Sequence, residues 1–169
     1  KSNLKAKCIE NLKVPFIITA TDLDNGKSVQ FRNGELAVRI AASCCMPVLF
    51  APVCIDGTHY VDGGVFMNLP VSSIRRECEK VVAINVSPLV ANEYKMNIVN
   101  IAMRSYNFMF RANTFSQRES CDLLIEPYNL HGYSNHELEK AEEIFEQGYN
   151  TANETLARLK EEKQCIWKQ

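Results

Sequence analysis

Residues 41–73 read AASCCMPVLFAPVCIDGTHYVDGGVFMNLPVSS, and the other elements of the chain are best placed relative to them. At their centre, YVDGG at 60–64 puts the carboxylate of Asp62 at the end of an apolar run, with two glycines directly after it. Glycine adopts backbone angles that other residues avoid and leaves no side chain in the way of an approaching group. The pattern therefore suits a carboxylate held at the mouth of a cleft. A tight turn after a strand, with Asp62 bonding to its own backbone, explains the same residues.

Five short blocks occur in order around Asp62: ATD at 20–22, GEL at 34–36, ASCCMPVLF at 42–50, YVDGG at 60–64 and NLP at 68–70. In this order they resemble the patatin-like phospholipases, a family of serine acyl hydrolases, and the resemblance extends over residues 14–88. It implies that Asp62 is one half of a Ser-Asp catalytic dyad and that Gly63 and Gly64 support its motif. It also implies a lipid or another acyl ester as the substrate.

The serine half of such a dyad is not found in this sequence. In the family the nucleophile sits in Gly-x-Ser-x-Gly, upstream of the aspartate block and near a glycine-rich oxyanion segment. No two of the seven glycines flank a serine at that spacing, and the chain opens at Lys1. We therefore expect residues 1–169 to be the C-terminal portion of a single patatin-like domain, inactive alone. Two alternatives stay open: a non-catalytic interaction or regulatory module that has lost the nucleophile, and an independent α/β binding domain.

The composition is that of an ordinary globular chain, with 46% hydrophobic residues, 23% charged residues and a net charge of -1. Because no basic cluster is present, no nucleic-acid partner is expected. The seven cysteines lack C-x-x-C spacing, which argues against a zinc site and a paired disulfide framework. They are expected to be apolar residues in a reducing compartment, so the predicted location is cytoplasmic. No metal or other cofactor is predicted.

Apolar runs predict strands alternating with helices. Continuous runs at 14–23, 81–86 and 121–127 suit strands covered on both faces, as in a parallel sheet. A turn at Asp24-Asn25-Gly26 is expected to connect the first run to an alternating strand at 27–32, so that the two strands form a hairpin. Further predicted elements are a helix at 34–45, one or two short strands at 51–65 with a turn at 56–57, and a short helix starting at 68–70. The predicted fold class is α/β, a largely parallel sheet with flanking helices in a three-layer, patatin-like arrangement.

Two longer amphipathic helices are predicted near the C-terminus. Residues 96–115 place one stripe of side chains on a helix: Ile98, Ile101, Ala102, Ser105, Phe108, Met109, Ala112 and Phe115. We favour a stripe that faces the core. With Arg104 and Arg111, the same stripe also suits a lipid surface, which would place the protein peripherally on a membrane. The second helix starts at the capping box Ser134-x-x-Glu137 and is expected to dock on the sheet; a coiled-coil surface is the less favoured alternative.

Aspartate titrates near 3.9 in water and is a weak base at neutral pH, but burial raises its pKa. Val61 and Val65 are consistent with such surroundings for Asp62. His59 is the one histidine near Asp62, and strand alternation directs it to the opposite face. His131 and His136 share no metal-binding spacing.

Asp22 and Asp56 are predicted to form turns. A sheet that lacks its N-terminal strands would also expose an unpaired edge, so self-association through that edge is expected.

Overall fold

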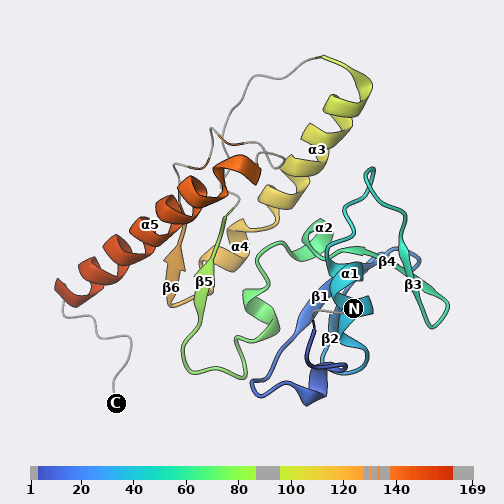
Figure 1. Cartoon of the computed structure of the whole chain (residues 1–169), viewed down its shortest axis with the longest axis horizontal. Coiled ribbons are helices and arrows are strands. Elements are labelled where there is room, and N and C mark those ends of the chain that lie inside the picture. The colour runs from blue at the N-terminus through green and yellow to red at the C-terminus, as the bar shows by residue number, and fades with distance from the viewer. Residues whose placement is uncertain (1–3, 87–95, 128–129, 131–132, 134–137, 162–169) are drawn as a thin grey trace.

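The computed structural model describes residues 4–86, 96–127, 130, 133 and 138–161, and it has a mixed α/β architecture (Figure 1). The strands are β1 (Ile18–Asp22), β2 (Lys27–Phe31), β3 (Val53–Ile55), β4 (Thr58–Asp62), β5 (Val82–Ile84) and β6 (Leu123–Ile125). The α-helices are α1 (Leu36–Ser43), α2 (Gly64–Met67), α3 (Ile98–Ala112), α4 (Phe115–Arg118) and α5 (Ala141–Glu161). Short 3-10 turns lie at Ile9–Asn11, Val71–Ser73 and Leu138–Lys140.

The N-terminal half forms a four-stranded sheet in the order β2-β1-β4-β3, in which every neighbouring pair is antiparallel. Two tight turns make this possible. Gly26 adopts a φ of 64°, and Asp56 and Gly57 adopt φ values of 51° and 82°. These are left-handed conformations that glycine and aspartate tolerate better than most residues. The predicted hairpin after residue 23 and the predicted turn at 56–57 are both confirmed.

The prediction of a largely parallel sheet is wrong for the described strands, because only β5 and β6 pair in parallel. Strands joined by a two-residue turn must run antiparallel. The burial of β1 along its whole length was correctly expected, but it has another cause. Helices α1 and α2 pack against β1, and β2 and β4 flank it, so an apolar run does not require parallel neighbours.

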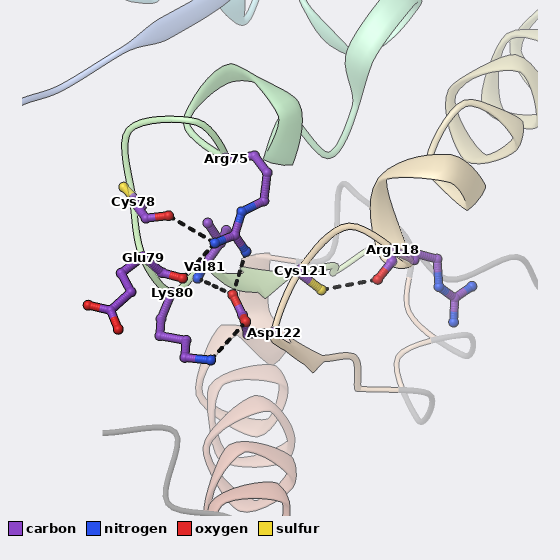
Figure 2. Close-up of polar contacts among 8 residues, drawn as sticks. All are labelled: Arg75, Cys78, Glu79, Lys80, Val81, Arg118, Cys121 and Asp122. Carbon is purple, nitrogen blue, oxygen red and sulfur yellow. Dashed lines mark hydrogen bonds and ion pairs between the residues drawn. The ribbon is translucent and has the colours of Figure 1, made fainter. Parts of the chain in front are cut away.

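A polar network joins the segment before β5 to the start of β6 (Figure 2). Asp122 accepts hydrogen bonds from the Arg75 guanidinium, from Lys80 and from the backbone N–H of Val81 at 2.7 Å. Arg75 also donates to the carbonyl oxygens of Cys78 and Glu79 at 2.9 and 2.7 Å. The hydrogen bond from Arg75 is the main reason that the pKa of Asp122 falls to about 2. The network therefore stays charged and intact except in strong acid, since the stabilising carboxylate is lost only as the pH falls toward that value.

The predicted stripe on α3 does not face the core in the described structure. Ile98 is 85% exposed and Met109 56% exposed, and Ile101, Phe108 and Phe115 are also exposed. The side of α3 that packs against α2 instead carries Tyr106, Phe110 and Asn113. Helical periodicity shows which apolar side chains share one side of a helix, but it does not show whether another element packs against that side. Within the described residues, no helix combines the length and apolar character needed to cross a bilayer.

The C-terminal helix forms as predicted and lies beside β6 (Figure 1). Its predicted start at 134–137 lies outside the described residues. Phe145 and Tyr149 are exposed and stack on each other with ring centroids 6.1 Å apart. The half-buried side carries Ile144, Gln147, Gly148, Thr151, Ala152, Thr155 and Leu159. In the N-terminal half, α2 ends at Met67, and the short helix expected to start at 68–70 is a 3-10 turn at Val71–Ser73 with Pro70 as its N-cap.

Candidate active site

Asp62 is the last residue of β4, and its backbone is held from two directions. Its N–H donates to the carbonyl oxygen of Cys45 at 2.9 Å, just after α1. Its own carbonyl oxygen accepts from the Thr21 hydroxyl at 3.0 Å, on the neighbouring strand β1. The Cα atoms of Asp62 and Ala20 are direct partners in the β1–β4 ladder. The position of the side chain is therefore set by the sheet and by the end of α1, not by a free loop.

The Asp62 carboxylate uses one oxygen locally. Oδ1 accepts the backbone N–H of Gly64 at 2.8 Å, so the turn-forming contact considered from the sequence is present. Among the described residues, Oδ2 has no hydrogen-bond partner. Burial raises the pKa of Asp62, and the Gly64 N–H offsets this only in part. Val61, next to it, is buried, as expected from its apolar character. A half-buried carboxylate with a raised pKa is a stronger proton acceptor than aspartate in water.

Gly63 and Gly64 are required because β1 and α3 pack closely against them, not because their backbone angles are unusual. Gly63 has an ordinary φ of -61°. A Cβ on Gly63 would lie 2.2 Å from the carbonyl oxygen of Thr19 on β1, and one on Gly64 would lie 1.9 Å from Cε1 of Phe110 on α3. Real Cβ atoms do not come this close to other atoms. The two glycines therefore let the segment after Asp62 pass between β1 and α3.

Asp62, Gly63 and Gly64 line a cavity of about 400 Å³, together with Ser43 and Cys44 at the end of α1. A second, larger cavity of about 760 Å³ lies next to it, and its lining is mostly apolar. The two share four lining residues, namely Phe16, Ile17, Thr19 and Pro70. The carboxylate therefore faces a space that continues along apolar surface.

Residues 2–74 match the family model described as patatin-like phospholipase. Over this segment the chain is similar to the patatin-like phospholipases. This chain is 33% identical over 107 residues to uncharacterized NTE family proteins of Mycobacterium bovis and of two strains of Mycobacterium tuberculosis. The aligned region is 63% of this chain and 30% of each relative, so the chain spans about a third of the length of the curated relatives it matches.

Two nucleophilic side chains of the patatin-like segment line the same cavity as Asp62, but neither is activated. The Ser43 hydroxyl donates to the carbonyl oxygen of Thr19 at 2.8 Å. Burial, and after it the negative charge of Asp62, raises the pKa of the Cys44 thiol, so the thiolate is disfavoured. Among the described residues, the cavity thus holds a carboxylate with a raised pKa but no activated nucleophile.

The remaining residues considered from the sequence lie away from this cavity. His59 is exposed and its Nδ1 lies 3.2 Å from the Asp24 carboxylate. Asp22 accepts hydrogen bonds from the backbone and side chain of Asn25, and Asp56 occupies the β3–β4 turn, so both form turns as predicted. His131 and His136 lie outside the described residues.

Sequence reasoning missed the contribution of α3 to the patatin-like site. The Asn113 side chain donates to the carbonyl oxygens of Gly64 and Val65 at 2.8 and 3.1 Å and accepts the N–H of Asn68 at 2.9 Å. It therefore clamps both ends of α2. The signal available beforehand was the spacing of Tyr106, Phe110 and Asn113, which places three residues on one side of a helix.

Proposed function

We propose that this chain supplies the base of a Ser-Asp dyad in a lipid acyl hydrolase, with the nucleophilic serine in another part of the same protein. The observation that carries the proposal is the Asp62 carboxylate: it lines a cavity, uses one oxygen to bind Gly64 and has a raised pKa. The family of the matched segment supports the same reaction class.

In this mechanism Asp62 accepts the proton of the serine hydroxyl as the serine oxygen attacks the ester carbonyl carbon. The tetrahedral intermediate collapses to an acyl-enzyme, and the leaving alcohol takes the proton from Asp62. A water molecule then attacks the acyl-enzyme while Asp62 accepts a proton from it. As the second tetrahedral intermediate collapses, Asp62 returns this proton to the serine oxygen, and the fatty acid is released. A base whose pKa lies near the operating pH serves both half-reactions better than an aspartate with an ordinary pKa would.

The apolar cavity beside the carboxylate supports an ester with an extended acyl chain. It shares Phe16, Ile17, Thr19 and Pro70 with the cavity that Asp62 lines, and Ile9, Leu12 and Ile74 add further apolar wall. Burying each methylene of an acyl chain against such surface contributes about 0.8 kcal/mol. Longer chains are therefore expected to bind better until the cavity is filled.

The full-length protein is expected to hydrolyse nitrophenyl esters and to react with a fluorophosphonate probe, which labels only an activated serine. Residues 1–169 expressed alone are expected to do neither. The measurement is ester turnover as a function of acyl length, with probe labelling read by mass spectrometry. A folded full-length protein that neither turns over esters nor takes up the probe would favour the non-catalytic module.

We also propose that the exposed stripe of α3 contacts an anionic lipid surface. Residues 96–117 contain two arginines, Arg104 and Arg111, and no acidic residue, so the charge that this segment carries beside the stripe is positive. An apolar helix face flanked by arginine is typical of helices that lie in the membrane interface. Such contact would bring the cavity to lipid esters.

Binding of the full-length protein to vesicles containing phosphatidylglycerol is expected to fall about tenfold or more for Ile98→Glu or Met109→Glu, because each removes an exposed apolar side chain that would be buried in the lipid. Phe145→Glu on α5 is the matched control, since it places the same charge at another exposed apolar position and is expected to bind normally. Vesicle co-sedimentation measures the difference. Unfolding of the α3 variants would instead indicate that another part of the protein covers this face.

A further inference from the structure

Tyr106 on α3 carries a buried hydroxyl whose oxygen has no hydrogen-bond partner among the described residues. Its side chain is among the most buried on that helix, with the residue 9% exposed. Buried hydroxyls in proteins are nearly always hydrogen bonded. The Tyr106 hydroxyl is therefore expected to have a hydrogen-bond partner that is not among the contacts of the described residues.

The side of α3 that carries Tyr106 lies over the segment that follows Asp62. The ring centroids of Tyr106 and Phe110 are 4.2 Å apart, and Phe110 packs directly against Gly64. One turn further along, Asn113 bonds to the carbonyl oxygens of Gly64 and Val65. Burial first, and then the negative charges of Asp62 and Cys45, raise the pKa of Tyr106, which agrees with this proximity.

Asp62 offers the complementary group. Its Oδ1 is taken by Gly64, whereas Oδ2 has no partner among the described residues. A donor without an acceptor and an acceptor without a donor thus lie in the same neighbourhood. The titratable side chains coupled to this carboxylate are Cys44 and Cys45, at the end of α1, and Tyr106 on α3.

We propose that Tyr106 is a positioning residue that donates a hydrogen bond, directly or through one water molecule, to the free oxygen of Asp62 in the assembled site. The proposal rests on the proposed function, in which Asp62 is the base. A hydrogen bond to a carboxylate stabilises its charged form and lowers its pKa. Tyr106 would therefore fix the orientation of Asp62 and counteract the effect of burial, keeping the carboxylate ionised at neutral pH.

Tyr106→Phe in the full-length protein is expected to shift the acid limb of the kcat/KM profile to higher pH by about one pH unit. At a pH below the new limb, kcat/KM should fall up to about tenfold, while KM stays unchanged. Tyr60→Phe is the matched control: it removes the same atom from β4, two residues before Asp62, where the ring packs on Phe31. A Tyr106→Phe profile that matches those of wild type and Tyr60→Phe would overturn the proposal.

A second readout does not depend on hydrolysis. In full-length protein labelled with ¹³C in the aspartate carboxyl groups, the resonance missing from Asp62→Asn belongs to Asp62. Its titration midpoint is expected to rise in Tyr106→Phe and not in Tyr60→Phe. If the protein hydrolyses no ester, the proposed function fails while this titration still tests the contact. An unchanged midpoint overturns the contact even where the enzyme is active.

Discussion

Asp62→Asn is expected to abolish ester hydrolysis by the full-length protein, with kcat falling by about a thousandfold or more. An amide cannot accept the serine proton, and loss of a positioned general base typically removes two to four orders of magnitude of rate. The amide oxygen can still accept the Gly64 N–H, so the turn and the cavity are expected to survive. Turnover of nitrophenyl esters at saturating substrate measures the effect.

The same substitution is not expected to reduce stability. The pKa of Asp62 is raised in the folded chain, so folding disfavours its ionised form. Such a carboxyl contributes most to stability when protonated at low pH, and that contribution is lost as the pH rises through the folded pKa. At pH 7 the neutral Asp62→Asn variant should therefore unfold at the same urea concentration as wild type or at a higher one. Asp56→Asn in the exposed turn is the control and should retain activity; retained activity in Asp62→Asn would remove this residue from the mechanism.

Gly63→Ala is expected to destabilise the full-length protein by about 3 kcal/mol, the upper part of the usual range for overpacking. The added methyl would lie 2.2 Å from a backbone oxygen of β1, which has no flexible end that could move aside. Either β1 and β4 separate or the segment after Asp62 shifts, and both displace the carboxylate. Hydrolysis should therefore fall with stability. Urea denaturation midpoints and ester turnover measure the two effects.

Gly148→Ala provides the matched control. Gly148 lies within α5, and a Cβ built there meets no atom within 4 Å. Alanine is the better helix former by about 1 kcal/mol, so this variant should be as stable as wild type or more so. Equal stability of Gly63→Ala and Gly148→Ala would contradict the packing of Gly63 against β1.

The elements around Asp62 could be predicted because their signals are local. Gly26 and Gly57 mark turns that only a few residue types allow, and Pro47 limits the helix before it. The pattern at 60–64 also singles out Asp62, Gly63 and Gly64. It does not show which atoms approach the glycines, because these belong to Thr19 and Phe110, which are distant in sequence.

The pairing of strands and the direction of helix faces could not be predicted in the same way. The run at 14–23 suits a buried strand whether its neighbours are parallel or antiparallel, so its apolar character does not distinguish the two. On α3, the residues that contact the segment after Asp62 are Phe110 and Asn113, and neither stands out in the sequence. Their importance follows from tertiary contacts alone.

The clamp that Asn113 places on α2 has a consequence for how the protein can be divided. The match to the family ends at residue 74, whereas the amide that binds Gly64, Val65 and Asn68 comes from well beyond that point, at the end of α3. A fragment cut at the end of the match would keep every signature residue and still lose the contact that orders them. The boundary of the recognisable motif and the boundary of the segment that holds it in place are therefore different in this chain.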